Sequence, residues 1–156
     1  MEEMEINAGI GRETIRIKYI DKDMPKLEYI DGEKSDWIDL RSAETITMLP
    51  GDYRLIHLGV AMELPNDYEA HIAPRSSTFK KFGVIEVNSL GIVDNSFCGD
   101  DDWWRFPALA MRQTTIHRGD RICQFRIVKK QPRIEFREVD SLRNPSRGGF
   151  GSTGVN

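Results

Sequence analysis

The segment "SRGGFGSTGVN" (146–156) combines glycines with polar groups that can bind a phosphate. A G-x-G-x-x-G spacing falls on Gly149, Gly151 and Gly154. Backbone N–H groups of glycine can approach an anion closely, Ser152 adds a hydroxyl donor, and Arg147 adds a positive charge. A dinucleotide-binding motif is not expected, because that motif needs a strand before it and a helix after it. A disordered terminus explains the segment alone equally well.

A second candidate for anion binding is "APRSS" (73–77), in which Arg75 is followed by Ser76 and Ser77. Either serine can cap one or two helical turns that end before Gly83. A helix start of this kind offers N–H groups, hydroxyls and a guanidinium to an anion. A simple helix cap without a ligand is the alternative interpretation.

The third candidate is "NSLGIVDNSFCGD" (88–100), an apolar strand followed by a polar turn that begins at Asp94. A hairpin here would leave backbone donors and acceptors free to read a flat base edge, although an ordinary hairpin with an aspartate in its turn is common. The next segment, "DDDWWRF" (100–106), places Trp103 and Trp104 on a predicted loop. Large aromatic rings exposed on a loop usually contact a ligand or another protein.

The elements that carry these segments are predicted to be strands, because the apolar residues repeat with a period of two. The runs are 15–19, 55–64, 121–130 and 133–139, with turn signals at 49–52, 64–67 and 117–120. Many short strands separated by turns indicate an all-β sandwich, jelly roll or barrel. The pattern stops near Asp140, which predicts one β domain (1–140) and a mobile arm (141–156).

Composition narrows the class of protein. The chain has 156 residues, of which 39% are hydrophobic and 30% charged, and its net charge is −3. This is the composition of a globular domain and argues against a general nucleic-acid binder, which would carry a basic surplus. We expect no membrane span and no signal peptide, hence a cytoplasmic protein. Cys98 and Cys123 are expected to be reduced thiols, a disulfide being the less favoured alternative.

The order of the segments is more specific than any one of them. "WIDL", "PRSS", "NSLGIVDNSFCGD", "RGDRICQ" and "RGGFGSTG" follow one another between residues 36 and 154. This order resembles the five motifs of the trimeric deoxyuridine triphosphatase (dUTPase) family. The resemblance implies a jelly-roll homotrimer with shared active sites that hydrolyses dUTP to dUMP and pyrophosphate with Mg²⁺, keeping uracil out of DNA and supplying dUMP. It implies no direct binding of nucleic acid or membrane.

The resemblance also implies roles for the third motif. Asp94 would orient and deprotonate the water that attacks the α-phosphorus. Asn88 would contact uracil, with the backbone of Gly91, Ile92 and Val93. The ring of Phe97, where the family usually has tyrosine, would pack on the deoxyribose and exclude a 2′-hydroxyl.

The other motifs would bind the phosphates and the metal ion. By resemblance, the phosphate ligands are Arg75, Ser76, Ser77 and Gln124. Asp39 would act on Mg²⁺ through bound waters, and the substrate phosphates would supply the remaining ligands.

The arm residues Phe150, Gly151 and Ser152 would close over the nucleotide. The family's arginine position is Pro145 here, so the γ-phosphate would be reached by Arg147, with Arg143 as the alternative. We also hypothesise that Trp103, Trp104 or Phe106 assists or replaces Phe150 in capping the base.

Two other functions remain open at this point. A dCTP deaminase has a related fold and a similar "RSS" segment, but that chemistry needs a glutamate on the strand after the base-binding hairpin, and "WWRFPALAM" (103–111) has no acid. A nucleotide-responsive regulatory protein, whose arm signals to a partner, is the alternative from another class.

Overall fold

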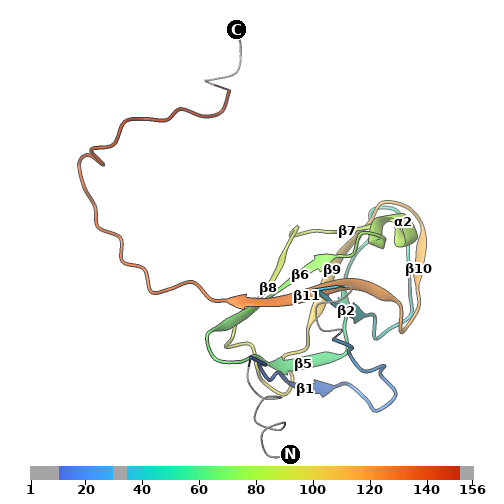
Figure 1. Cartoon of the computed structure of the whole chain (residues 1–156). Coiled ribbons are helices and arrows are strands. Elements are labelled where there is room, and N and C mark those ends of the chain that lie inside the picture. The colour runs from blue at the N-terminus through green and yellow to red at the C-terminus, as the bar shows by residue number, and fades with distance from the viewer. Residues whose placement is uncertain (1–10, 30–34, 152–156) are drawn as a thin grey trace, which may run out of the picture.

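The computed structural model describes residues 11–29 and 35–151. Within these ranges the chain forms short antiparallel strands and a single helix (Figure 1). The elements are β1 (Arg16–Tyr19), β2 (Ile38–Arg41), β3 (Ile46–Met48), β4 (Tyr53–His57), β5 (Val60–Glu63), β6 (Tyr68–Pro74), α2 (Thr78–Phe82), β7 (Val84–Glu86), β8 (Gly91–Val93), β9 (Arg105–Ala110), β10 (Thr114–Ile116) and β11 (Arg121–Lys129). The prediction of an all-β domain with one short helix is confirmed.

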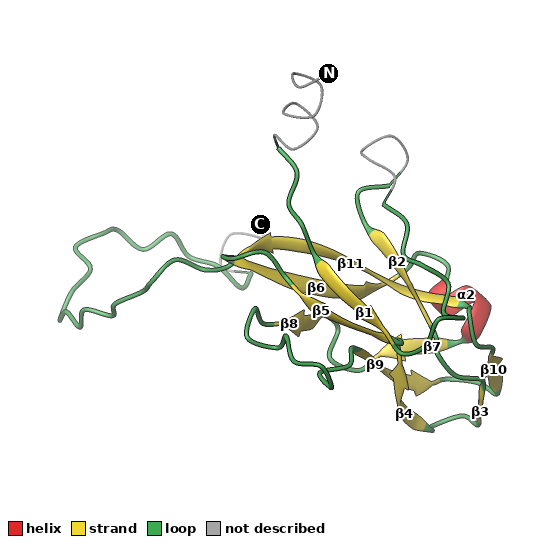
Figure 2. Cartoon of the chain, turned by 90° about the horizontal axis from the view of Figure 1, so that it is seen from below, coloured by secondary structure: helices red, strands yellow, loops and turns green. Residues whose placement is uncertain are grey.

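The strands form two larger sheets and two pairs, which Figure 2 shows from below. The larger sheets have the orders β2-β11-β6-β8 and β4-β9-β7, and the pairs are β1-β5 and β10-β3. Inward-facing apolar side chains from these strands make one core, whose largest fully buried members include Leu40, Ile56, Trp104, Phe106 and Phe125. Burial of this apolar area is the main favourable term that holds the sheets together.

The run 55–64 shows where the period-two pattern succeeds and where it fails. All residues assigned to one face are buried: Ile56, Leu58, Val60, Met62 and Leu64. The run is nevertheless two strands, because β4 pairs with β9 and β5 pairs with β1. Gly59 separates them with a φ of +71°, and a Cβ there would lie 3.0 Å from the Cβ of Ala43. Its positive φ and this close approach both favour glycine.

The helix α2 begins and ends where the sequence predicts. Ser77 occupies the N-cap position without a side-chain cap bond, and Gly83 ends the helix with a φ of +61°. The buried hydroxyl of Thr78 accepts a hydrogen bond from the Arg75 N–H and donates one to the Ile122 carbonyl, both at 2.8 Å. This hydroxyl therefore ties the "PRSS" turn to β11.

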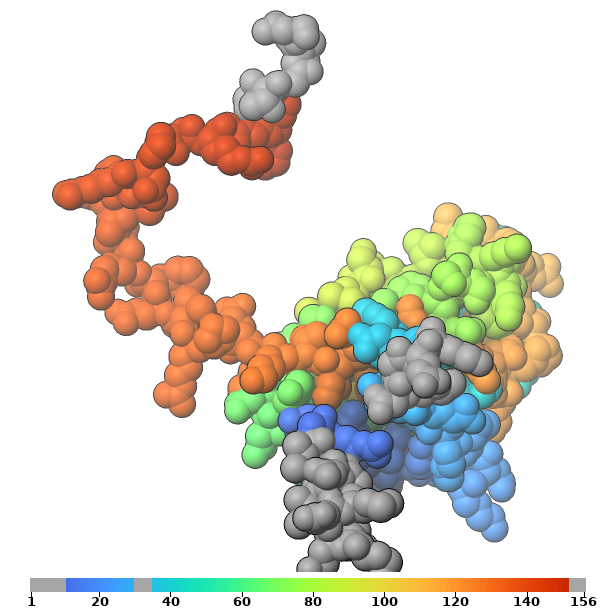
Figure 3. Space-filling model, viewed as in Figure 1, coloured from blue at the N-terminus to red at the C-terminus, as the bar shows by residue number. Residues whose placement is uncertain are grey.

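The prediction of a strand at 133–139 is wrong. The last strand, β11, ends at Lys129, and the described residues beyond it (130–151) form an exposed, extended arm that leaves the β domain (Figure 1, Figure 3). Phe136 is 95% exposed, and Ile134 is 54% exposed. A strand needs a partner for its backbone groups, and among the described residues no strand pairs with this segment.

Both cysteines are free thiols, as predicted: Cys98 is exposed and Cys123 is buried. Among the described residues, no helix has the length and apolar character needed to cross a membrane.

Candidate active site

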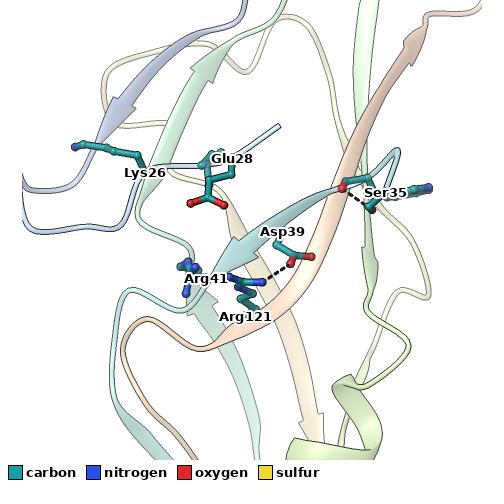
Figure 4. Close-up of a pocket in the computed structure, with 8 residues that line it drawn as sticks. Lys26, Glu28, Ser35, Asp39, Arg41 and Arg121 are labelled. Atoms are coloured by element: carbon teal, nitrogen blue, oxygen red, sulfur yellow. Dashed lines mark hydrogen bonds and ion pairs between the residues drawn. The ribbon is translucent and has the colours of Figure 1, made fainter. Parts of the chain in front are cut away.

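The first, second and fourth motifs meet around Asp39. Asp39 lies on β2 directly opposite Gln124 of β11. Its carboxylate forms an ion pair with Arg75 Nε at 2.9 Å and lies 3.5 Å from Arg121 Nη1 (the latter pair is drawn in Figure 4). Gln124 Nε2 donates to the Pro74 carbonyl at 3.1 Å, next to Arg75. The fold therefore brings Asp39, Arg75 and Gln124 together from distant parts of the sequence.

A small pocket opens beside this cluster (Figure 4). It is lined by Asp39 and Arg121, and by Lys26, Glu28 and Arg41. Sequence reasoning missed Lys26, Glu28 and Arg41. A signal for Arg41 existed, because residues two apart on a strand share a face and Arg41 follows Asp39 by two. Lys26 and Glu28 lie between strands, where no periodicity indicates a direction.

Ser76 and Ser77 stand at the entry to α2, next to the Arg75–Asp39 pair. Ser76 is exposed and Ser77 is half-buried. Within the described ranges, neither hydroxyl forms a hydrogen bond, so both can donate to a ligand. The cluster therefore presents guanidinium, amide and hydroxyl donors on one side of the domain, a combination suited to an anion.

The third motif follows a different topology from the predicted hairpin. β7 pairs with β9, whereas β8 pairs with β6, so residues 87–90 cross from one larger sheet to the other. The hairpin expected around the Asp94 turn does not form, because the strand before the turn, β8, pairs with β6, and the strand after it, β9, pairs with β4 and β7. In the described part of the chain β8 is an edge strand, and its outer backbone groups have no neighbouring strand. Gly91 and Val93 are buried, while Ile92 is 59% exposed.

Asp94 and Phe97 lie in the turn after β8. Asp94 and Asn88 are exposed, and Phe97 is 39% exposed. The Phe97 N–H donates to the Asp94 carbonyl at 3.0 Å. Asn95 anchors the turn by donating to the carbonyls of Pro65 and Tyr68, at 2.8 and 3.1 Å. The Asp94 carboxylate makes no hydrogen bond within residues 11–29 and 35–151, which leaves it available to a water.

Asp94 does not meet the Asp39 cluster within one chain. Along β6, Ala73 pairs with Gln124 and Ala70 pairs with Val93. Asp94 is one residue further on, so about four residues of strand, or ~13 Å, separate it from Gln124 along β6. Gly91 pairs with Ile72, so the start of β8 lies nearer to the cluster than Asp94 does.

The arm residues also lie away from the cluster in this chain. Arg147, Phe150 and Gly151 are exposed on the extended arm (Figure 3), and so is Arg143. Ser152 lies outside the described residues. None of the four described arm residues contacts the predicted site within the chain.

The capping hypothesis is wrong for two of its three aromatic residues. Trp104 and Phe106 are 1% and 0% exposed, and the Trp104 ring packs edge-on against Phe125 with centroids 5.1 Å apart. A ring buried in the core cannot cover a base. Trp103 contacts His57, at 5.4 Å between centroids, and lies under Lys18 Nζ at 5.2 Å. Its role toward a nucleotide stays a prediction.

One buried acid had no place in the sequence-based site. Glu86, the last residue of β7, is 6% exposed and faces the core, as Val84 does. Burial raises the pKa of its carboxyl to about 7, and the Gly91 N–H opposes that shift. Alternation along "VIE" (84–86) predicts its inward direction, but a charged residue type hides that signal.

The fold and the gathered side chains define the class: an all-β protein with a cluster of cationic and amide groups on one side of the domain. The dUTPase family model matches residues 33–154. The SPbeta prophage-derived deoxyuridine 5'-triphosphate nucleotidohydrolase YosS of Bacillus subtilis is 55% identical over 141 residues, covering 90% of this chain and 98% of that protein. The deoxyuridine 5'-triphosphate nucleotidohydrolase of Thermobifida fusca is 34% identical, covering 96% and 84%. The chain therefore belongs to the dUTPase family, and the predicted enzyme class, dUTP diphosphatase, is confirmed at that level.

Solved structures agree with this fold. The dUTPase of Staphylococcus bacteriophage 80alpha, in a complex with dUpNHpp, matches with a TM-score of 0.71 at 18% identity, over 84% of this chain and 99% of that chain. The dUTPase of Streptococcus mutans matches with a TM-score of 0.66 at 17% identity, over 76% and 98%. The jelly-roll-like β fold predicted from the sequence is confirmed.

Proposed function

We propose that the protein hydrolyses dUTP to dUMP and pyrophosphate, using Asp94 to activate water. The observation that carries the proposal is the convergence of Asp39, Arg75 and Gln124 beside the unpaired hydroxyls of Ser76 and Ser77, in a chain of the dUTPase family. These donors suit a triphosphate. The open edge of β8 suits a planar base whose edge alternates donors and acceptors.

The chemistry follows from the positions of the third-motif residues. Asn88 and the backbone of Gly91, Ile92 and Val93 bind uracil. The Asp94 carboxylate accepts a hydrogen bond from water, aligns it with the α-phosphorus and takes its proton. Pyrophosphate leaves as the water oxygen bonds to phosphorus. A carboxylate is a weak base, so much of the rate comes from alignment and from charge neutralisation on the phosphates.

Arg75, Ser76, Ser77 and Gln124 supply that neutralisation. Asp39 holds the guanidinium of Arg75 through a 2.9 Å contact, which fixes the direction of its remaining N–H donors. A planar guanidinium held in this way binds a phosphate oxygen with little further loss of freedom.

The donor set fits a Mg²⁺ ion that arrives with the substrate. In the described part of the chain, no three His, Cys, Asp or Glu side chains are grouped so as to hold a metal ion. Mg²⁺ commonly takes its ligands from substrate phosphates and waters, with one or two carboxylates. When bound, the ion would neutralise phosphate charge. Asp39 is the carboxylate that would touch its water shell, in addition to positioning Arg75.

Active sites shared between copies explain the separation of the motifs. A nucleotide places its base, α-phosphorus and γ-phosphate in that order. In one chain, Asp94 lies beside one end of β6, and the phosphate cluster with Gln124 lies beside the other end. The start of β8, which would read the base, lies between them, opposite Ile72. One chain therefore cannot present all these groups to one dUTP in sequence. A second copy that supplies the phosphate cluster resolves the conflict, which supports an oligomer with shared active sites. The resemblance to the dUTPase family makes that oligomer a homotrimer, whose extended arms would reach neighbouring copies.

The outer face of the β4-β9-β7 sheet is suited to self-association, and its disruption is testable. Tyr53 and Leu55 of β4 and Ile85 of β7 are 53%, 49% and 39% exposed, and Tyr53 and Ile85 flank Leu109 of β9. Leu55→Glu should shift the trimer toward monomer, as measured by light scattering, and lower kcat about 100-fold because the sites are divided. Lys22→Glu, on an exposed loop, is the control that should change neither. A fully active Leu55→Glu monomer would contradict shared sites.

Phe97 should decide between deoxyribose and ribose. We expect the wild type to prefer dUTP over UTP strongly, because the ring leaves no room for a 2′-hydroxyl. Phe97→Ala should lower the ratio of kcat/KM for the two substrates at least tenfold. Phe97→Tyr keeps the ring and should retain the ratio. An unchanged ratio in the alanine variant would remove Phe97 from the sugar pocket.

The overall proposal is tested by assaying pyrophosphate from dUTP and ammonia from dCTP with the same preparation. Pyrophosphate without ammonia is expected. Ammonia release would instead support the deaminase alternative. The structure disfavours it, since β9 carries no acid and the buried Glu86 precedes the base-binding strand. A regulatory role was the other alternative, and a pull-down with and without dUpNHpp would reveal a nucleotide-dependent partner.

A further inference from the structure

Glu86 is a buried acid without a hydrogen-bonding partner. Neither of its carboxyl oxygens has one among the described residues. A buried carboxylate without a counter-charge is strongly unfavourable, so the uncharged acid is the form that this environment favours. A buried acid without a partner lowers the stability of the domain relative to an apolar side chain, so its presence indicates a role other than packing.

Glu86 contacts both ends of the turn that carries Asn88. Its backbone carbonyl accepts the Ser89 N–H at 3.1 Å. Its carboxyl packs against Gly91, where a Cβ would lie only 3.2 Å from Oε1. Between these contacts the backbone of the turn is strained, because Ser89 has a φ of +61°. A residue other than glycine rarely adopts this left-handed conformation. Support from Glu86 thus stabilises the geometry of the turn and of the first residue of β8.

We propose that Glu86 is a positioning residue for base recognition: its uncharged carboxyl packs beneath Gly91 and holds the 87–90 turn and the β8 edge in the conformation that binds uracil. This inference rests on the proposed function, because it assigns the base to that edge. Ionisation of Glu86 places a charge in the core that the Gly91 N–H attracts but no cation balances. Hydration of that charge draws the carboxylate out of its packing against Gly91 and weakens binding of the base.

Among the described residues, no counter-charge stabilises the ionised form of Glu86. On β9 its neighbour is Ala108, and on β6 the residue nearest to Gly91 is Ile72. From β7, Glu86 acts electrostatically on the buried thiol of Cys123 on β11, whose pKa is raised by burial and then by Glu86. Asp39 and Arg75 also act on that thiol. The pKa of Glu86 itself responds to burial and to the Gly91 N–H, with no lysine or arginine of the described residues contributing.

The test is the pH profile of KM for dUTP between pH 6 and 8.5 in wild type and Glu86→Gln. The KM of the wild type should rise as the pH exceeds about 7, where Glu86 ionises. If the ionised form does not bind dUTP, this rise approaches tenfold per pH unit. The kcat should not change with it. Glu86→Gln, which cannot ionise, should show a KM without this rise. Ionisation of the terminal phosphate occurs near pH 6 and affects both proteins equally. Glu63→Gln, an exposed acid on β5, should retain the wild-type profile.

The failures are distinguishable. Absence of dUTP hydrolysis in every protein would overturn the proposed function. Hydrolysis with parallel KM profiles in wild type and Glu86→Gln, or a rise seen in kcat alone, would overturn the role of Glu86. If Glu86→Gln does not fold, Glu86→Leu carries the same prediction. A wild-type KM that is constant to pH 8.5 overturns the inference without any variant.

Discussion

Asp94→Asn is expected to lower kcat for dUTP hydrolysis by about 10³-fold, since general-base catalysis contributes roughly 10²–10⁴. The amide keeps the size of the side chain but cannot take a proton from water. Binding should survive, because the substitution leaves the uracil edge and the phosphate ligands in place. The measurements are single-turnover release of pyrophosphate and the Kd of dUpNHpp, which should change only a few-fold.

The matched control for this substitution is Asp101→Asn. Asp101 is also an exposed acid, on the loop seven residues further along the chain, and has no assigned role. It should retain wild-type kcat and KM. An Asp94→Asn enzyme that keeps a tenth or more of the wild-type rate would show that another group activates the water. A variant that loses binding of dUpNHpp as well would instead make Asp94 a binding residue.

Removing residues 141–156 should have the second largest effect, lowering kcat about 100-fold or more with little change in Tm. Every described residue from 141 to 151 is exposed, so the segment adds no buried area to its own chain. We expect the arm to close over the nucleotide and exclude water, a step that aligns the reactants. A loss of 1 kcal/mol would shift the Tm of a domain of this size by only about 2–4 °C.

Point variants separate the contributions of the arm. Phe150→Ala should raise KM, because the ring would otherwise lie on the base. Arg147→Ala should lower kcat more than Arg143→Ala if Arg147 reaches the γ-phosphate, and the reverse order would identify Arg143. A shortened enzyme with wild-type kcat, or with a Tm much lower in the absence of ligand, would contradict a closing arm.

Much of the domain could be predicted because it depends on local patterns. Alternation in the run 55–64 predicts the buried residues Ile56, Leu58, Val60, Met62 and Leu64, since most inward side chains on a strand are apolar. Ser77 and Gly83 mark the ends of α2 because their backbone requirements are local. The motif order likewise predicts the family, since each motif is a short continuous segment.

Other features depend on contacts that no local pattern contains. The same run divides into two strands because β9 and β1 offer separate edges. Trp104 is buried because Phe125 and the core accept it, although its acidic neighbours indicate a loop. The segment 133–139 has a strand's alternation but no pairing strand in the part of the chain that the structure describes.

Residue type and spacing therefore suffice to predict the all-β class, the buried face of the run 55–64, the helix ends and the dUTPase family. Three features depend on how the chain folds. Asp39 lies opposite Gln124 and forms an ion pair with Arg75, Asp94 lies about four residues of strand from Gln124 along β6, and Glu86 is buried beneath Gly91. The physical reason is that strand pairing and burial are set by distant segments. Hydrogen-bond partners and dielectric environment therefore become defined only when those segments meet.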